Sequence, residues 1–558
     1  MQLSGSEMIV KCLLEQNVDI IFGYPGGANL PLYDALYDAP IRHVLTVHEQ
    51  GAAHAADGYA RSSGKVGVCI ATSGPGATNL VTGLATAFMD SSPVVAITGQ
   101  VATTLFGQDS FQEVDVIGVT MPITKHNFLV KDISELAETV RKAFHIAGSG
   151  RPGPVLIDVP RDIMLARSEF TAAICTNGKI PAKERSAQPS FQDTVMAAVE
   201  VIHRAKQPVM LVGGGMKAGD TWKEVKKLAE TLRIPVVSTL MGLGAFPAKH
   251  PCFLGLTGMH GHKTANWTVS EADVILAVGT RFSDRVTSDC SKYAIGKTII
   301  HLDVDSTEVN KNIPAEIVVI GDLQRTLLAM NAAFLNRPTV DFSYWWERIA
   351  SWQKDFFVKY NTNSLNAPWI MQHMSGNTLG QSVIWVTDVG QHQMWAAQHL
   401  QIDLPRNWIS SGGLGTMGFG VPAAIGAQFA CPDKRTVLVV GDGGFKMTGM
   451  ELYTAINAEL PIIIVIINNQ ALGLVRQLQR EFCRQRYTES NLANFDFAGF
   501  AHICGALAAT ANTSAEFSSA FAQALQSERA FVIVANIARE DLVEPMVSPG
   551  QPINQFVR

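Results

Sequence analysis

Apolar residues along the chain fall into short runs of strand length, each followed by a glycine-rich turn and then by a helical pattern. The runs are rich in Val and Ile, which is typical of strands covered on both faces. This alternation indicates parallel sheets with helices on both sides, and it appears in three blocks. We therefore predict an α/β protein of three domains, each a mostly parallel sheet flanked by helices. The runs are 20–27, 66–76 and 93–100 in the first block, 208–215, 234–244, 273–282 and 299–305 in the second, and 383–393, 436–444 and 461–469 in the third.

Irregular stretches separate the three blocks. The stretch 171–190 loses hydrophobic periodicity and gains Pro, Lys and Ser. A second stretch, near 343–366, is rich in aromatic residues. A chain of 558 residues is also too long for a single hydrophobic core. The first and third blocks are candidates for related folds. We expect domains over 1–170, 191–340 and 366–537, linkers over 171–190 and 341–365, and a C-terminal tail over 538–558.

The N-terminal residues, the apolar runs and the charge of the chain indicate which compartment and partners to expect. Residues 1–16 predict an amphipathic helix capped by Ser4 or Ser6, without a charged and apolar leader before it. The longest apolar runs, such as 462–467, are far shorter than the roughly 18 residues of a membrane span. With 44 basic and 49 acidic residues the chain has no basic footprint for nucleic acid. Its eight cysteines lack zinc-ligand spacing. We expect a cytoplasmic protein with free thiols and with neither nucleic acid nor a membrane as partner.

Polar residues follow two neighbouring strands of the third block. Asp442 comes directly after the run 436–440, flanked by Gly441 and Gly443, and Asn469 ends the next run. The carboxyl ends of parallel strands share one edge of a sheet, so these side chains are expected to lie together. A carboxylate and an amide oxygen suit Mg²⁺ that clamps a diphosphate, and glycines let the backbone approach phosphates. An Asp-Gly pair by itself is usually only a turn.

The spacing from Gly441-Asp442-Gly443 to Asn469 resembles the signature of the thiamine diphosphate-dependent enzymes. The resemblance implies that Mg²⁺ is held by the Asp442 side chain, the Asn469 side chain and the carbonyl of Ala471. It also carries over further cofactor contacts, which are Val389, Gly390, Gln391, His392, Gly415, Met417, Gly441, Gly443 and Gly444.

Two further residues would activate the cofactor according to the same resemblance. Glu49, between a strand and the small-residue helix pattern 51–60, corresponds to the acid that bonds the aminopyrimidine ring and promotes its imino tautomer. Met417 corresponds to the wedge that bends the cofactor so that its two rings meet. Taken alone, Glu49 is an ordinary acidic residue at a helix N-terminus, and Met417 is ordinary packing.

Many short stretches extend the resemblance along the whole chain to the large catalytic subunits of acetohydroxyacid synthase, also called acetolactate synthase. Among them are FGYPGG, HEQGAA, ATSGPGATNL, FQEVDV, GRPGPVLIDVP, GMHG, DVGQHQMWAAQ and GGLGTMGFG. Members decarboxylate pyruvate and transfer the resulting two-carbon hydroxyethyl unit to a second pyruvate or to 2-oxobutyrate. The products are 2-acetolactate and 2-aceto-2-hydroxybutyrate, at the first common step of valine, leucine and isoleucine biosynthesis.

The resemblance implies an acceptor site and a flavin site as well. Arg285 matches the residue that receives the carboxylate of the second substrate, although Asp284-Arg285 alone reads as a surface ion pair. Gln112 and Lys125 match further active-site positions. The middle block resembles a domain that binds FAD in a structural, non-redox role, with contacts at Gly214, Thr239, Leu240, Gly258, Met259, His260, Gly279, Arg281, Asp303 and Asp322. No GxGxxG accompanies them, so the flavin is implied by resemblance only.

Two positions depart from the family pattern. Leu478 stands where the family has Trp, in an acceptor pocket that favours 2-oxobutyrate, so we expect a reduced preference for that acceptor. With Ala102 and Ser110, this position also belongs to the family's herbicide entrance, and weak sulfonylurea inhibition is expected. Gly444 replaces a Ser whose hydroxyl can bind phosphate.

Other interpretations and the partners stay open at this point. A pyruvate oxidase would use the flavin as an electron acceptor, a decarboxylase would leave Arg285 without a role, and a non-catalytic subunit would have lost Glu49, Asp442 or Asn469. The resemblance implies a homodimer or homotetramer with active sites at the dimer interface. Many members also bind a small regulatory subunit.

Overall fold

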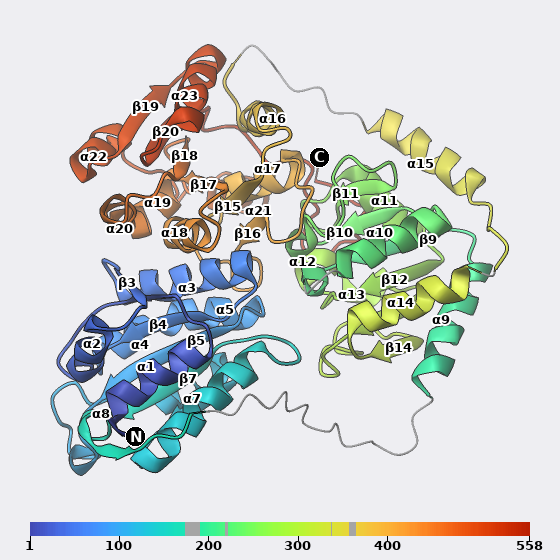
Figure 1. Cartoon of the computed structure of the whole chain (residues 1–558). Coiled ribbons are helices and arrows are strands. Elements are labelled where there is room, and N and C mark those ends of the chain that lie inside the picture. The colour runs from blue at the N-terminus through green and yellow to red at the C-terminus, as the bar shows by residue number, and fades with distance from the viewer. Residues whose placement is uncertain (173–189, 218–220, 336, 357–363, 558) are drawn as a thin grey trace.

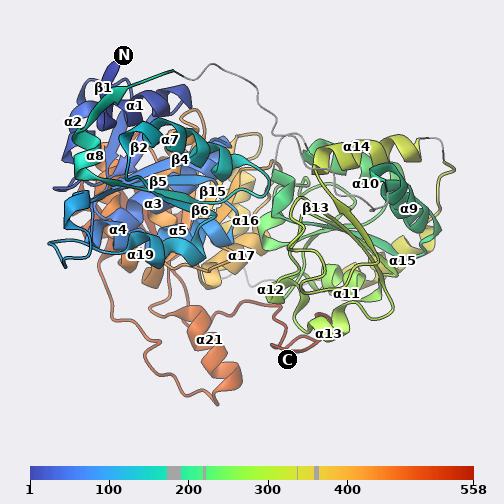
Figure 2. The same cartoon turned by 90° about the horizontal axis from the view of Figure 1, so that it is seen from below.

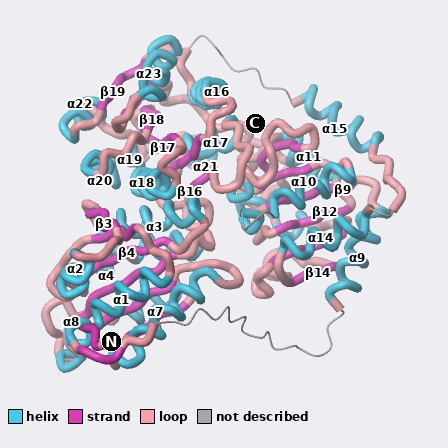
Figure 3. The backbone as a smooth tube through the Cα atoms, in the orientation of Figure 1, coloured by secondary structure: helices cyan, strands magenta, loops and turns pink. Residues whose placement is uncertain are grey.

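The computed structural model describes residues 1–172, 190–217, 221–335, 337–356 and 364–557, which form three lobes (Figure 1). Each lobe is built on a six-stranded sheet in which every strand pairing is parallel. Helices cover both faces of these sheets (Figure 3). The predicted fold class is confirmed. The linker predicted over 171–190 falls largely on 173–189, outside the described residues.

The first lobe has the strand order β3-β2-β4-β5-β7-β6, with a small antiparallel pair β1-β8. Ser4 is the N-cap of its first helix and forms a capping box with Glu7, so one of the two expected caps is confirmed. The strands are β1 Gln2–Ser4, β2 Ile20–Gly23, β3 Arg42–Leu45, β4 Gly67–Ala71, β5 Val94–Gln100, β6 His126–Leu129, β7 Val155–Pro160 and β8 Arg167–Glu169. The helices are α1 Gly5–Glu15, α2 Leu30–Tyr37, α3 Glu49–Ser63, α4 Pro75–Asn79, α5 Val81–Met89, α6 Val116–Thr120, α7 Ile133–Gly148 and α8 Arg161–Leu165.

The second lobe has the order β11-β10-β9-β12-β13-β14. Numbered along the chain, this is 3-2-1-4-5-6, the order of dinucleotide-binding folds. The strands are β9 Pro208–Val212, β10 Val236–Ser238, β11 Phe253–Leu256, β12 Val274–Val278, β13 Thr298–Asp303 and β14 Ile317–Ile320. The helices are α9 Phe191–Arg204, α10 Thr221–Leu232, α11 Lys263–Glu271, α12 Asp284–Thr287, α13 Cys290–Tyr293, α14 Leu323–Phe334 and α15 Ser343–Asp355, with short 3₁₀ turns η3 Gly214–Lys217 and η4 Leu240–Gly242.

Helix α15 is a correction to the linker expected over 341–365. Trp345 is fully buried and donates its indole N–H to the Pro208 carbonyl at 3.1 Å. Trp352 packs edge-on against Trp345. The aromatic residues that looked irregular therefore form a helix that packs on the second sheet, because their large side chains are buried there.

The third lobe has the order β16-β15-β17-β18-β20-β19. The strands are β15 Val383–Thr387, β16 Trp408–Ser410, β17 Arg435–Gly441, β18 Ile463–Asn468, β19 Leu507–Ala511 and β20 Phe531–Asn536. The helices are α16 Ala367–Asn377, α17 Gln391–His399, α18 Gly420–Ala430, α19 Asp442–Thr448, α20 Leu452–Asn457, α21 Gly473–Phe482, α22 Phe497–Cys504 and α23 Ser514–Gln526, with the 3₁₀ turn η5 Gly449–Glu451. Numbered along the chain, the first and third sheets both have the order 2-1-3-4-6-5.

Helices α3 and α18 join the first and third lobes (Figure 1). One hydrophobic core cluster contains residues of both lobes, including Ala52, Ala56 and Ala423. A side chain at Gly58 would collide with the Ala423 backbone, and one at Gly426 would collide with the Ala55 carbonyl. The two helices therefore cross with their backbones in contact.

None of the helices in the described ranges combines the length and the apolar character needed to cross a bilayer.

Candidate active site

Asp442 begins α19, directly after β17, and its carboxylate is buried with 2% exposure. One oxygen accepts a hydrogen bond from the Gly443 amide at 2.9 Å. Burial raises the pKa of Asp442 to about 6, while the nearby backbone amides of Gln470 and Ala471 partly lower it. Those two amides belong to the loop after β18, so the structure brings Asp442 and that loop together, as the strand order predicts.

Asn469 lies at the start of the same loop and is 7% exposed. Its Oδ1 accepts from the Ala471 amide at 3.2 Å, and its Nδ2 donates to Gln391 Oε1 at 3.1 Å. The amide is therefore oriented, with its oxygen directed to the side of Ala471. A carboxylate, an amide oxygen and the chain at 469–471 thus form an oxygen-rich corner of the type that Mg²⁺ prefers.

The turn after β15 forms a glycine cradle beside this corner. Gly390 has φ 152°, and a Cβ there would lie 2.9 Å from the His392 ring. A Cβ at Gly441 would lie 2.8 Å from the same ring. His392 is buried, which lowers its pKa to about 3 and keeps it neutral, and its Nε2 has no hydrogen-bond partner within the described residues. A buried, unsatisfied nitrogen next to two bare glycines fits a site for a polar ligand group.

Asp388 is a buried carboxylate that the sequence analysis missed. It accepts hydrogen bonds from the amides of Val389, Gly418 and Gly420, and burial raises its pKa to about 6. It thereby fixes the glycine-rich loop 411–420 against the turn after β15. Its position after a strand, like that of Asp442, was the available signal.

The arrangement gives a steric reason for glycine at position 444. A Cβ at Gly444 would lie 2.5 Å from Asp388 Oδ1, so a side chain there would displace the carboxylate. Met417 lies near the same place, because a Cβ on Gly443 would be 3.6 Å from Met417 Cε. Gly415, with φ 72°, adopts a left-handed conformation that suits glycine.

Glu49 is the first residue of α3 and is partly buried. Its Oε2 accepts from Asn79 Nδ2 at 2.9 Å, and a Cβ on Gly76 would lie 3.2 Å from its Oε1. Asn79 is a second residue that was missed, although it lies within the motif ATSGPGATNL. Within the described chain, no hydrogen bond or ion pair joins Glu49 to Asp442.

Gln112 and Lys125 occupy different surroundings in the same lobe. Gln112 has φ 62°, and it packs where Gly74 has no side chain. Lys125 Nζ donates to the carbonyls of Ile146 and Ser149, at the end of α7, and burial lowers its pKa. The Lys125 ammonium thus caps a helix C-terminus in this structure.

Arg285 and Leu478 lie at the surface. The Arg285 side chain is 65% exposed, 3.8 Å from Asp284, and its Nη1 contacts Met259 Sδ at 3.2 Å. Leu478 is 37% exposed on α21, which projects from the third lobe beside the C-terminal end of the chain (Figure 2). The structure brings Arg285 next to Met259, one of the predicted flavin contacts, but not into contact with Asp442.

The predicted flavin contacts all follow strands of the second sheet. Gly214 comes after β9, Thr239 after β10, Gly258 after β11 and Gly279 after β12. The remaining members of the set, Leu240, Met259, His260, Arg281, Asp303 and Asp322, lie in the same turns, at the end of β13 or after β14. The structure therefore collects them at the carboxyl edge, where ligands of such sheets bind.

A buried ionic junction joins the first lobe to the glycine-rich loop of the third. Arg61 forms ion pairs with Asp57 at 2.6 Å and Asp90 at 3.1 Å and donates to the Ser410 carbonyl at 2.8 Å. Asp90 in turn accepts from the amides at 412 and 413. Glu451 similarly accepts from the amides at 47 and 48, just before Glu49. These carboxylates were not predicted.

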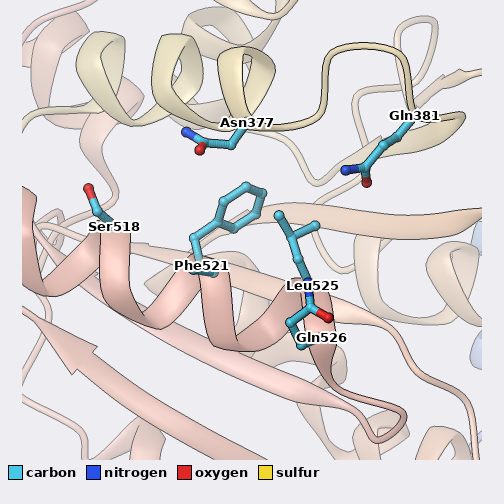
Figure 4. A pocket seen from close by; sticks show the side chains of 7 residues that line it. Asn377, Gln381, Ser518, Phe521, Leu525 and Gln526 are labelled. Atoms are coloured by element: carbon cyan, nitrogen blue, oxygen red, sulfur yellow. The ribbon is translucent and has the colours of Figure 1, made fainter.

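A separate cavity of about 240 Å³ lies between α16 and α23 (Figure 4). Phe521 forms its floor, with Asn377 and Gln381 on the opposite wall. None of the predicted site residues lines it.

Family models of known proteins match a stretch of each of the three lobes. Family models described as thiamine pyrophosphate enzyme N-terminal TPP binding domain, central domain and C-terminal TPP binding domain match residues 3–119, 195–330 and 388–535. The chain belongs to the thiamine pyrophosphate enzymes. Two of these descriptions name a TPP binding domain, which supports thiamine diphosphate as predicted.

Relatives within the thiamine pyrophosphate enzymes match over nearly the full chain. The probable acetolactate synthase large subunit of Methanocaldococcus jannaschii is 43% identical over 100% of this chain and 95% of its own length. The acetolactate synthase isozyme 2 large subunit of Escherichia coli K12 is 43% identical, with 98% of both chains covered. The isozyme 3 large subunit of the same organism is 42% identical over 94% of this chain and 93% of its own. The predicted family is confirmed.

Proposed function

We propose that this chain is the catalytic subunit of a thiamine diphosphate-dependent acetolactate synthase. It decarboxylates pyruvate and transfers the two-carbon unit to a second pyruvate or to 2-oxobutyrate. The observation that carries the proposal is the buried corner of Asp442 and 469–471 beside the glycine cradle, in a chain whose full-length relatives are named acetolactate synthases.

The residues of the third lobe would hold Mg²⁺ and the diphosphate. Asp442 and Asn469 supply side-chain oxygens, and Ala471 supplies a backbone carbonyl. Gly390 and Gly441 make room for the His392 ring, whose Nε2 has no hydrogen-bond partner among the described residues and would meet a phosphate oxygen. A carboxylate whose pKa is raised to about 6 by burial also gains strongly from a bound cation.

When bound, thiamine diphosphate supplies the electron sink that decarboxylation of a 2-oxo acid needs. Glu49 supplies a carboxylate to its aminopyrimidine ring. The Asn79 hydrogen bond to Oε2 orients this carboxylate, and glycine at position 76 leaves Oε1 uncrowded. Met417, held by the loop that Asp388 fixes, would pack beside the cofactor.

Arg285 would receive the carboxylate of the acceptor, since its guanidinium is exposed and lacks a close bidentate partner. The carboxyl edge of the second sheet would bind FAD in a structural role. Its strand order and the left-handed glycines at 258 and 279 support a ligand at this edge.

A second copy of the chain would complete each active site. Large apolar side chains are exposed on both the first and the third lobe, where a second copy would cover them. Phe111 is 87% exposed on the first lobe, while Met447 and Met450 on the third are 59% and 55% exposed. We therefore infer a homodimer or a dimer of dimers. The relatives named large subunits suggest that a small regulatory subunit binds as well.

The deciding experiment incubates the purified protein with pyruvate, thiamine diphosphate, Mg²⁺ and FAD and identifies the product. Acetolactate supports the proposal. Acetaldehyde without acetolactate would identify a decarboxylase, and peroxide or acetyl phosphate would identify an oxidase. Sedimentation of the loaded protein should give a dimer or tetramer, and an active monomer would contradict the shared site.

A further inference from the structure

A chain of buried side-chain amides links Asn469 to the C-terminal segment. Asn469 Nδ2 donates to Gln391 Oε1 at 3.1 Å, and Gln391 Nε2 donates to Gln477 Oε1 at 2.9 Å. Gln477 Nε2 then donates to the Val543 carbonyl at 2.9 Å. Both glutamines are 4% exposed and Asn469 is 7% exposed. Three segments that are distant in sequence, at 391, 469–477 and 543, are thus connected by buried hydrogen bonds.

Val543 fixes the direction of this chain. Its amide donates to Gln477 Oε1 at 3.0 Å while its carbonyl accepts from Gln477 Nε2. A side-chain amide can turn over and exchange its oxygen and nitrogen, but backbone groups cannot. A reversed Gln477 would set donor against donor and acceptor against acceptor. Only one orientation of Gln477 therefore satisfies Val543.

The orientation passes from Gln477 to Gln391. Gln391 Nε2 donates both to Gln477 Oε1 and to the Asp541 carbonyl at 3.1 Å, so one hydrogen is directed to α21 and the other to the C-terminal segment. Its Oε1 is left to face Asn469. A side chain at Gly473 would fall on Gln391 Oε1 and Asn469 Nδ2, so this glycine provides the space in which the two amides meet.

We propose that Gln477 is a positioning residue for the cation site. With Val543 it orients Asn469 so that Oδ1, and not the hydrogen-bearing Nδ2, faces the side of Asp442. The inference rests on the proposed function, because it assigns the cation to Asp442 and Asn469. An amide oxygen binds a hard cation and an amide N–H repels it. Docking of the C-terminal segment and binding of the cation therefore strengthen each other.

The test compares Gln477→Leu with Gln428→Leu. Gln428 is a matched control, since it is a buried amide, 2% exposed, that ties α18 to the loop after it by donating to the Lys434 carbonyl. Mg²⁺ is titrated into each purified full-length protein with thiamine diphosphate present. Binding is followed by tryptophan fluorescence, because Trp395 donates its indole N–H to the Leu542 carbonyl of the C-terminal segment.

Loss of a partner that orients a metal ligand typically costs about 10–100-fold in metal affinity. We expect Gln477→Leu to raise half-saturating Mg²⁺ at least about tenfold, and Gln428→Leu to leave it within about twofold. Trypsin should also cleave after Arg539 faster in Gln477→Leu only. Unchanged Mg²⁺ binding by Gln477→Leu would overturn the proposal.

A second variant covers the case in which Gln477→Leu does not fold. Gln477→Glu keeps the volume and the acceptor but sets an oxygen against the Val543 carbonyl, so the same rise in half-saturating Mg²⁺ is expected, and its absence overturns the proposal. Failure of the proposed function gives a different result. Wild-type protein that binds Mg²⁺ and thiamine diphosphate but makes no acetolactate refutes the reaction and leaves the amide chain standing.

Discussion

The first and third sheets share a strand order but present different chemistry at their carboxyl edges. After its third and fourth strands the third sheet carries Asp442 and Asn469, whereas the first sheet carries the Gly-Pro-Gly turn 74–76 and Gln100. The carboxylate of the first sheet, Glu49, follows the second strand instead. The same strand order thus occurs in both lobes, and the residues that follow the strands determine what each carboxyl edge can bind.

The contact between the fourth and sixth strands shows the same division. In the third sheet Asn468 donates to Asn536 at 2.7 Å, a neutral amide pair. In the first sheet Asp158 accepts from Thr98 at 2.7 Å and from Gln100 at 3.0 Å. The first lobe therefore has a titratable carboxyl, Asp158, at this strand contact, whereas the third lobe has the neutral amide of Asn536.

The largest effect should come from the edge of the third sheet. Asp442→Ala removes the charged cation ligand, so we expect acetolactate formation to fall by about three orders of magnitude or more, because the preorganised electrostatics of the site are lost. The matched control is Asn468→Ala, which changes the neighbour of Asn469 whose side chain faces Asn536 instead. Turnover measured over a range of Mg²⁺ concentrations distinguishes the two variants. Full activity of Asp442→Ala would show that the edge of the third sheet does not bind the cation.

The second effect should come from the first sheet. Glu49→Gln keeps the shape but loses the carboxylate, so turnover should fall roughly 10²-fold to 10⁴-fold while thiamine diphosphate binding changes little. Steady-state kinetics and cofactor titration measure the two quantities separately. Glu169→Gln, an exposed position on β8, serves as the control. Equal losses of binding and turnover would place Glu49 with the third-sheet residues.

The pH dependence of stability should distinguish the two strand contacts. Burial raises the pKa of Asp158 from 3.8 to about 7, so the folded state holds this proton more tightly than the unfolded state. Its contribution to stability is fully present below about pH 4 and is lost as the pH rises through 7. Between pH 5 and 8 we expect wild type to lose on the order of 2 kcal/mol relative to Asp158→Asn in urea unfolding. Asn536→Asp should introduce a similar dependence in the third lobe, and parallel curves for all three proteins would refute the assignment.

The smallest effect should concern the choice of acceptor. Leu478→Trp adds a large apolar surface on α21, and we expect about a tenfold gain in preference for 2-oxobutyrate over pyruvate. Competition between the two acceptors measures it. Arg480→Trp adds the same ring on another face of α21 as the control. An unchanged product ratio would show that Leu478 does not line the acceptor pocket.

The sequence was sufficient to predict the sheets and the corner at Asp442, because apolar runs mark buried strands and parallel order brings their ends together. It was not sufficient for α15, where closely spaced tryptophans hid a helical pattern. Nor did it predict Asp388, Glu451 or the capping contacts of Lys125. Their partners are backbone amides or carbonyls, which every residue carries and no motif distinguishes.

The crossing of α3 and α18 has a consequence for dynamics. Where Gly58 and Gly426 bring the backbones together, no layer of side chains remains whose rotamers could rearrange, and packed interfaces of this kind do not deform gradually. The first and third lobes of one chain should therefore move as a single rigid body. Any opening that admits substrate or releases product is then left to the second lobe, the C-terminal segment and the proposed interface with a second copy.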